Sequence, residues 1–274
     1  MKYTGSKEST QYITLLSVIS CFAVVLLHTN GCFWNFSSSE LYWKTANIIE
    51  SVCYFAVPIF FMVSGATLID YSDRYSTKTF FIKRVKKTVI PFVAWSVVGI
   101  AFSCFALKTI DVAIVGKKFI INSIFDASVV TVYWFFPTLF CGYLCMPLFT
   151  AISKEKRKST FSYLVVVGYF VNFLIPLLKN VFSVDLSFPL SLSVVNNPLI
   201  FFLTGYLISH CDFPDKKNIY IISVVALIVH IVGTYILSMD AGTSVRTFKN
   251  PAISVPYASG IFLFLYLFST PKNL

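Results

Sequence analysis

Long apolar segments alternate with short polar connections along almost the entire chain. Crossing about 30 Å of hydrocarbon takes about 20 helical residues at a rise of about 1.5 Å each, and eight segments reach or approach that length. The predicted helices cover residues 12–31, 48–68, 88–107, 130–152, 160–178, 190–209, 218–238 and 252–270. The pattern therefore predicts an all-α, polytopic transmembrane helical bundle of about eight spans.

Composition removes the soluble alternatives. Hydrophobic residues make up 57% of the 274 positions and charged residues 12%, whereas about a quarter of the residues of a soluble domain are charged. Eight helices with short connections use the whole length. We therefore expect one integral-membrane domain over residues 1–274 and no separate soluble domain.

The positive charges are divided unevenly between the two sets of connections. With the N-terminus placed inside, 15 of the 22 lysines and arginines fall in inner segments and 7 in outer segments. Cytoplasmic connections carry the excess of Lys and Arg, so both termini are predicted to be cytoplasmic. The same bias, with anionic lipid as the partner, accounts for the net charge of +10 without nucleic acid.

The longest outer connection, residues 108–129, is half apolar. Phe119 and Ile124 can line one face of a short helix, with Lys117 and Lys118 opposed to them. The segment is expected either to lie in the outer membrane interface, as a lid, or to pack as a loop on the helix ends.

The seven cysteines do not form a recognisable framework. Their number is odd, most of them lie within apolar segments, and no C-x-x-C pair occurs. We expect small buried apolar residues and neither disulfides nor a metal site.

Two ionisable residues near the outer ends of the first two helices are the first catalytic candidates. His28 lies three residues before the end of helix 12–31, and Glu50 lies two residues into helix 48–68, at a similar depth. Ionisable groups inside membrane helices are costly and often functional. Glu50 can orient or charge-stabilise His28, as a histidine general base requires. Alternatively, both are interfacial polar groups that face water.

The other two histidines have simpler interpretations. His230 lies near the middle of helix 218–238 and is expected to be a core histidine bonded to a neighbouring hydroxyl or carbonyl, with catalysis as the alternative. His210 lies at an inner helix end and is expected at the surface.

Two ordered patterns lie in residues 54–95, P-x-F-F-x-x-S-G and then F-x-x-x-R-x-x-K-x-x-x-P. Their residues are Pro58, Phe60, Phe61, Ser64 and Gly65, followed by Phe80, Arg84, Lys87 and Pro91. In this order and context the chain resembles the bacterial membrane-bound acyltransferase 3 family, most strongly over residues 12–95. The resemblance implies transfer of an acyl group, usually acetyl, from cytoplasmic acyl-CoA to a surface glycan, a lipid-linked sugar or a similar acceptor.

The resemblance also implies roles for individual residues. The family's first helix carries an arginine, ten further residues and then a histidine proposed to act in acyl transfer; here SVISCFAVVLLH places Ser17 and His28 at these positions. His28 would take the acceptor proton and Glu50 would support the imidazolium. Arg84 and Lys87 would hold the phosphates of coenzyme A in place of the missing arginine. The positive-inside rule alone also explains this basic cluster.

Ser64 has two interpretations. Its hydroxyl either donates a hydrogen bond to the developing oxyanion of the acyl donor, or it belongs to a small-residue packing contact with Gly65.

The predicted function is therefore that of a multi-pass acyltransferase of the bacterial plasma membrane, which O-acetylates a cell-surface polysaccharide or a lipid-linked sugar. The resemblance implies acetyl-CoA or another acyl-CoA as the donor substrate, and no cofactor is expected to be permanently bound. The expected partners are acyl-CoA, the glycan acceptor and membrane lipids.

Two alternatives stay open from the sequence. Asn196, Asn197 and Pro198 interrupt the sixth helix, which favours a transporter or flippase for a polar lipid or glycan. Ser17, and an end at Leu274 without the family's last helix, favour an inactive relative.

Overall fold

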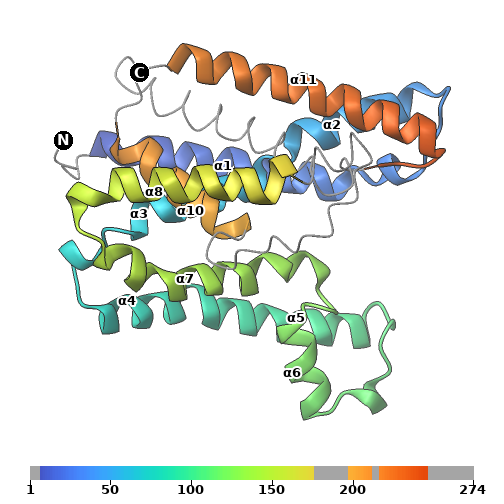
Figure 1. Cartoon of the computed structure of the whole chain (residues 1–274). Coiled ribbons are helices and arrows are strands. Elements are labelled where there is room, and N and C mark those ends of the chain that lie inside the picture. Colours follow the sequence, from blue (N-terminus) through green and yellow to red (C-terminus); the bar gives the residue numbers. More distant parts are fainter. Residues whose placement is uncertain (1–6, 176–196, 212–215, 246–274) are drawn as a thin grey trace. The chain divides into compact units, whose positions relative to one another are not determined.

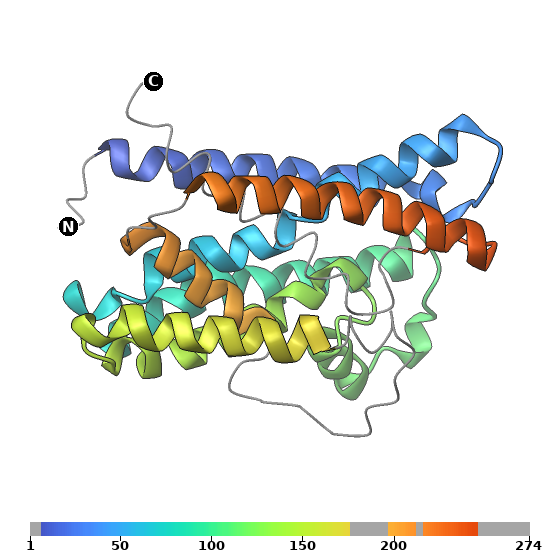
Figure 2. The same ribbon diagram turned by 45° about the horizontal axis from the view of Figure 1, so that its top comes forward.

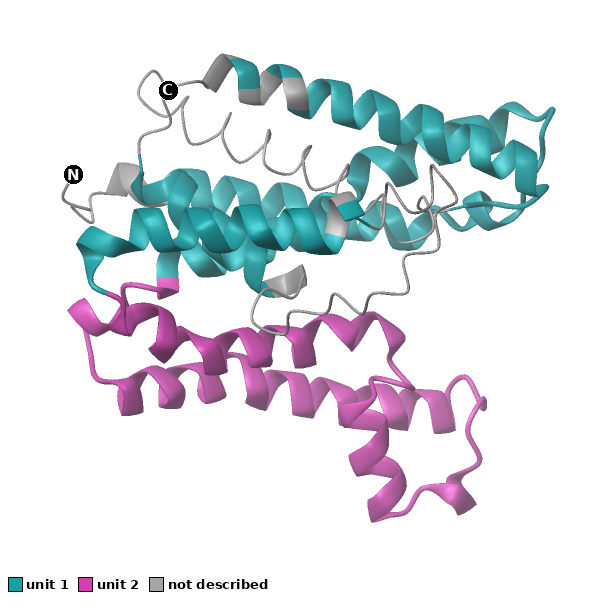
Figure 3. Ribbon diagram, viewed as in Figure 1, with its two compact units in different colours: residues 1–67, 153–274 teal, residues 68–152 magenta. Residues whose placement is uncertain are grey.

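The structure is a computed structural model that describes residues 7–175, 197–211 and 216–245, and the regular elements within these ranges are helices (Figure 1). The chain divides into two compact units (Figure 3). Unit 1 contains residues 1–67 and 153–274, and unit 2 contains residues 68–152.

Unit 1 is a group of helices in which α2 packs on both α1 and α11, and α8 packs along α10 (Figures 1 and 2). Its helices are α1 (Lys7–Thr29), α2 (Leu41–Cys53), α3 (Ala56–Leu68), α8 (Lys154–Tyr169), α10 (Asn197–His210) and α11 (Lys216–Ala241), with the 3-10 helix η1 (Gly31–Trp34) and the π-helical turn η6 (Phe170–Leu174).

Trp43 fixes the start of α2 inside unit 1. Its side chain is fully buried, and its indole N–H donates to the carbonyl of Phe33 at 3.1 Å and to the hydroxyl of Ser244 at 2.8 Å. The ring of Tyr235 lies 5.9 Å from the Trp43 ring. Trp43 therefore joins α2 to η1 and to the end of α11.

The second predicted helix is interrupted, and Pro58 explains the interruption. Proline has no N–H to donate to the carbonyl four residues earlier, and its ring crowds that carbonyl. The carbonyl in question belongs to Tyr54, and the helix breaks at residues 54–55, between α2 and α3. The helical pattern resumes with the bond from the Ile59 amide to the Phe55 carbonyl at 3.2 Å.

Helices α3 and α10 cross at contact distance between their backbones. A Cβ added to Gly65 would lie 1.8 Å from the carbonyl oxygen of Phe202, and a Cβ added to Gly205 would lie 2.0 Å from that of Met62. Each helix therefore contributes a glycine at the point where the other helix presents a carbonyl. Small residues permit such close approach between membrane helices.

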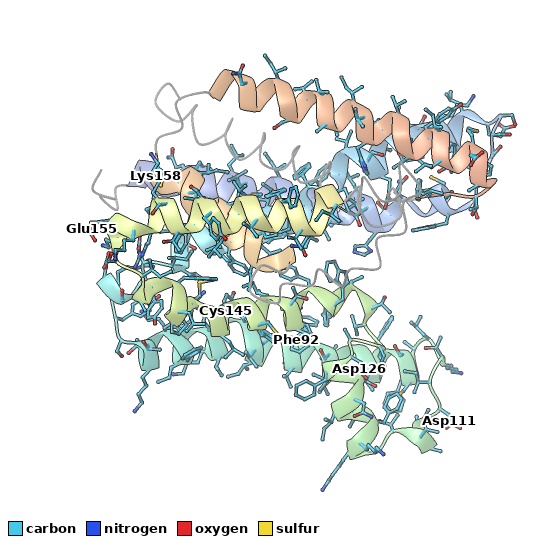
Figure 4. The ribbon with its side chains drawn as sticks, in the orientation of Figure 1. Phe92, Asp111, Asp126, Cys145, Glu155 and Lys158 are labelled. Carbon is cyan, nitrogen blue, oxygen red and sulfur yellow. The ribbon has the colours of Figure 1, made fainter. Side chains whose placement is uncertain are left out.

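A buried arginine links α8 to α10. Arg157 is 3% exposed, its Nη1 donates to the Tyr206 hydroxyl at 3.3 Å, and its guanidinium lies over the Tyr206 ring. The ring of His210 stacks on the same Tyr206 ring, with 4.3 Å between ring centroids. By contrast, Glu155 and Lys158 of α8 are exposed (Figure 4).

Unit 2 is built on α5 and α7, which run side by side (Figure 1). Its elements are η2 (Tyr71–Asp73), α4 (Thr77–Arg84), the π-helical turn η3 (Val85–Val89), α5 (Ile90–Phe105), η4 (Val112–Ile114), α6 (Lys117–Phe125), η5 (Thr131–Trp134) and α7 (Phe135–Ala151). Phe92 of α5 (Figure 4) packs against the rings of Phe136 and Phe140 of α7, with 5.1 and 5.4 Å between ring centroids.

The outer connection of unit 2, residues 108–129, contains the short helix that one of the two predictions for this segment required. Helix α6 packs on α5, and its predicted apolar face, with Phe119 and Ile124, is half-buried, whereas Lys117 and Lys118 are exposed. Asp111 lies directly before η4, and Asp126 lies directly after α6 (Figure 4). Its position in the membrane interface stays a prediction.

The membrane-spanning pattern is confirmed in part. Five helical stretches of the described ranges are long and apolar enough to cross a membrane, namely Gln11–Thr29, Leu41–Asp73, Thr77–Phe105, Thr131–Ala151 and Ser223–Ala241. The predicted eighth helix, 252–270, lies outside the described residues, as do parts of the fifth and sixth. The number of eight spans and the cytoplasmic termini stay predictions.

Candidate functional site

Glu50 is a buried acid whose described partner is an asparagine that the sequence did not single out. The side chain is 3% exposed, and its Oε2 accepts a hydrogen bond from Nδ2 of Asn30 at 3.2 Å. The same Asn30 amide donates to the carbonyl of Ala46 at 2.9 Å. Asn30 directly follows the end of α1 and is itself 6% exposed. Its two hydrogen bonds therefore form a buried link from the end of α1 to α2 inside unit 1.

His28 lies on a different face of α1 from the one that meets Glu50. Its side chain is exposed, and in the described part of the chain no hydrogen bond joins it to Glu50. The reason is periodicity, since residues two apart on a helix project about 200° apart. The structure therefore brings Asn30, and not His28, into contact with Glu50. The catalytic roles of His28 and Glu50 stay predictions.

His28 and Ser17 share one side of α1. Eleven residues are close to three helical turns of 3.6 residues, so the two side chains project in nearly the same direction. The Ser17 hydroxyl donates to the carbonyl of Ile13 at 2.8 Å. That bond stays within the helix, so Ser17 does not reproduce the long reach of an arginine at this position.

Ser64 lies in α3 next to the glycine of the close helix crossing. Its side chain is half-buried, whereas Gly65 faces the backbone of Phe202. The packing interpretation therefore applies to Gly65. The proposed hydrogen bond of the Ser64 hydroxyl to an oxyanion stays a prediction.

Arg84 of unit 2 is held by aromatic rings. Its Cζ lies 5.8 Å from the centroid of the buried Phe80 ring and 5.7 Å from that of Tyr143. The Tyr71 ring stacks on the Phe80 ring, with 4.4 Å between ring centroids. Contacts of a guanidinium with aromatic faces position the cation without neutralising its charge.

The guanidinium of Arg84 has no acidic partner within the described ranges. Its Nε is buried and makes no hydrogen bond there. A buried N–H of a charged group without an acceptor is costly, and an anionic ligand would supply one. Neighbouring Lys83 is engaged differently, because its Nζ lies 3.9 Å from the centroid of the Tyr75 ring. Arg84 is therefore the best-prepared anion-binding group of unit 2.

A π-helical turn separates Arg84 from α5. It covers Val85–Val89, and the Ile90 amide donates to the carbonyl of Val85. Pro91 explains the wider turn, because its ring would crowd the carbonyl of Lys87 in a regular α-helix. Lys87 lies in this turn and is exposed. Such π-turns occur frequently at functional sites.

The sequence carried a signal for one of the three supporting residues, Phe80, Asn30 and Tyr143. Phe80 belongs to the same ordered pattern as Arg84, four residues before it, which on a helix places the ring beside the guanidinium. Asn30 follows His28 by two residues, but only the course of η1 back toward α2 brings it to Glu50. Tyr143 is distant in sequence, and the packing of α7 alone brings it to Arg84.

The two groups can do different chemistry. In unit 1, an exposed imidazole can accept a proton, and a buried carboxylate is held by Asn30. In unit 2, an arginine fork and an exposed lysine can bind phosphate oxygens. No cluster of three or more potential metal ligands occurs among the described residues.

Comparison with known proteins identifies one family. A family model described as an acyltransferase domain, of the acyltransferase 3 type, matches residues 10–273. Neither the curated proteins nor the solved structures give a significant match. The family match covers nearly the entire chain, including both groups described above.

Proposed function

The chain belongs to the acyltransferase 3 family of membrane acyltransferases, and from this membership we propose that it transfers an acetyl group from acetyl-CoA to a hydroxyl of a cell-surface glycan or a lipid-linked sugar. The observation that carries the donor half of the proposal is the aromatic-held Arg84, whose buried Nε has no acceptor in the described ranges.

The donor binds through its phosphates. Coenzyme A carries several phosphate oxygens, and a planar guanidinium binds such oxygens with two parallel N–H donors. Arg84 is the fork and Lys87, exposed in the following π-turn, is an added point charge. Both residues precede α5 in a segment rich in lysine, which the positive-inside rule assigns to the cytoplasmic side. That side is where acyl-CoA is available.

The acceptor is activated by His28. Its imidazole takes the proton of the acceptor hydroxyl, and the hydroxyl oxygen attacks the thioester carbonyl. The ester C–O bond forms, the thioester C–S bond breaks, and the proton goes to the leaving sulfur. The carboxylate of Glu50 is hydrogen-bonded to Asn30. Glu50 therefore supports the transient imidazolium of His28 through its electric field and without a direct hydrogen bond. Ser64 donates to the oxyanion of the tetrahedral intermediate.

Donor binding is tested with the full chain reconstituted in nanodiscs and titrated with acetyl-CoA. Arg84→Gln removes the charged fork while keeping a polar side chain, and Arg84→Lys keeps the charge without the fork. Lys83→Gln is the matched control, since that charge lies over the Tyr75 ring. We expect the dissociation constant to rise at least about tenfold for Arg84→Gln, less for Arg84→Lys and little for Lys83→Gln, because charge-assisted hydrogen bonds contribute about 1.5–3 kcal/mol.

Binding that is equally strong in all four proteins would remove Arg84 from the donor site. Absence of binding in the folded wild-type chain would contradict acyl-CoA as the donor altogether.

The transport alternative rests on the interruption at residues 196–198. From Asn197 to His210 helix α10 is continuous, and residue 196 lies outside the described residues. The transport function stays the second candidate. The alternative of an inactive relative is tested by glycan acylation in cells that carry the chain as their only copy.

A further inference from the structure

A row of polar side chains runs along the buried face of α11. Ser223, His230, Thr234 and Ser238 are spaced by seven, four and four residues, which places them on one side of the helix. Each of them is at most 3% exposed. Helix α11 otherwise presents exposed apolar residues over its spanning stretch, Ser223–Ala241.

Helix α2 presents a matching polar row to α11. Asn47 and Ser51 are each 1% exposed. The Asn47 amide donates to the carbonyl of Ile231 at 3.2 Å, and the hydroxyls of Ser51 and Thr234 are 3.2 Å apart. Glu50 lies beside them on α2 and is also buried. We call this contact between the two helices the polar seam.

Two members of the polar seam have polar atoms without hydrogen-bond partners in the described part of the chain. They are the Oδ1 of Asn47 and both ring nitrogens of His230. The imidazole of His230 is fully buried and lies 6.2 Å, centroid to centroid, from the ring of Tyr54. This differs from the hydrogen-bonded core histidine that the sequence predicted.

Unpaired polar atoms in such a place require a physical explanation. A buried imidazole without a hydrogen bond is penalised, and membrane surroundings provide no water from the lipid side. Buried polar groups of this kind are normally bonded to internal water. Asn47 and Ser51 on α2, and His230, Thr234 and Ser238 on α11, follow one another at about one helical turn, about 5.4 Å, along each axis. That distance is close to two hydrogen bonds of about 2.8 Å in series, the reach of a single bridging water.

We propose that the polar seam between α2 and α11 is an internal water site, in which water is bound by His230 and by Asn47, a residue about one helical turn from Glu50 along α2. The ligand class is water itself, held by an amide oxygen and an imidazole. The Ser51–Thr234 pair belongs to the same seam and continues the hydrogen-bonded row.

This site has a consequence that rests on the acyl transfer proposed above. In that reaction the hydroxyl proton leaves the acceptor and must reach the sulfur of the departing coenzyme. Water bound to an imidazole can hold a proton in transit, as histidine does in proton relays. His230 is then a positioning residue for the proton, and it does not touch the acyl group.

The experiment uses hydroxyl-radical footprinting of the full chain in nanodiscs, read by mass spectrometry. Radicals generated from bound water oxidise neighbouring side chains even where the bulk solvent is excluded. Met62 is the dry reference, because it is readily oxidised but fully buried at the α3–α10 crossing. Trp34, which is 58% exposed, is the accessible reference.

The variants separate water binding from packing. His230→Phe removes both ring nitrogens, and Asn47→Leu removes the unpaired oxygen. Val229→Phe is the matched control, since it introduces the same side chain one residue away at an exposed position of α11. Thermal unfolding is measured for each protein.

The inference predicts oxidation of His230, which is as fully buried as Met62, several-fold above Met62 in the wild type. It also predicts a several-fold drop in the labelling of the half-buried Tyr54 in His230→Phe but not in Val229→Phe. Labelling of His230 as low as that of Met62, or a His230→Phe protein that unfolds at a higher temperature with unchanged labelling of Tyr54, would overturn it. Neither readout uses acyl transfer, so an inactive wild-type chain would count against the proposed function alone.

Discussion

At the scale of single residues, the partner of a buried charge decides what that charge can do. The position of Glu50 along the sequence suggested a direct pairing with His28, but Asn30 occupies the contact. Arg84 shows the opposite case, because the sequence pointed to this residue and the structure adds the two rings that hold it. Residue types at the right depth could be predicted. The hydrogen-bond partners could not, since the connection through η1 decides which face of α1 meets α2.

The Asn30–Glu50 bond yields a stability prediction. Asn30→Leu removes the donor and leaves the carboxylate with one described hydrogen bond fewer, which we expect to lower the free energy of unfolding by about 1–3 kcal/mol. The measurement is chemical denaturation in detergent.

Glu50→Gln is the partner variant for a double-mutant cycle. A neutral amide needs less stabilisation than a carboxylate, so Asn30→Leu should cost less in the Glu50→Gln background. Equal costs in both backgrounds would show that the two side chains do not interact.

At the scale of helices, prolines and glycines set the geometry that positions the candidate residues. Pro58 ends α2 three residues after Glu50, and Pro91 widens the turn that carries Lys87. The apolar pattern predicted where the helices lie, because period and length are local properties. It could not predict that one predicted helix is two, or that another includes a π-turn, although both prolines were visible in the sequence.

The close crossing of α3 and α10 predicts an unusual sensitivity to a methyl group. Gly65→Ala and Gly205→Ala each place a Cβ on a backbone carbonyl, so we expect a loss of about 1–3 kcal/mol or more of stability for each. Thermal unfolding of the reconstituted chain measures it. Gly31→Ala is the control, because nothing lies within 4 Å of its added Cβ. Equal unfolding temperatures for all three variants would contradict the crossing.

The π-turn makes a second prediction at this scale. Pro91→Ala restores the missing N–H and relieves the crowding, so the turn should relax to a regular α-helix and rotate Arg84 by about 100° relative to α5. We expect weaker acetyl-CoA binding together with unchanged or increased stability. Pro147→Ala in α7 is the control, since that proline has no π-turn before it. Unchanged donor affinity in Pro91→Ala would separate the turn from the donor site.

At the scale of the whole molecule, the sequence already excluded a soluble protein, because 12% charged residues cannot cover a soluble surface. The family match and the five candidate spans confirm a membrane acyltransferase at that level. The acceptor could not be predicted, because acceptor choice depends on side chains that converge in space, and no ordered pattern of the sequence records them.

The predicted orientation is tested with two native cysteines. Cys32 in η1 is exposed and falls on the predicted outer side, whereas Cys211 follows α10 on the predicted inner side. In intact cells, a membrane-impermeant maleimide should label a protein that keeps only Cys32 and should spare one that keeps only Cys211. After permeabilisation both should react. Labelling of Cys211 in intact cells would invert the orientation and place Arg84 away from cytoplasmic acyl-CoA.

The central claim, acyl transfer through His28, is tested most directly by glycan acylation in cells that lack the native protein. The cells are complemented with wild type, His28→Ala or the adjacent control Thr29→Ala, at matched membrane abundance. A general base contributes about 10²- to 10⁴-fold to a rate, so acyl groups should return with wild type and Thr29→Ala and be lost with His28→Ala. Full restoration by His28→Ala, or none by the stably inserted wild type, would contradict the account.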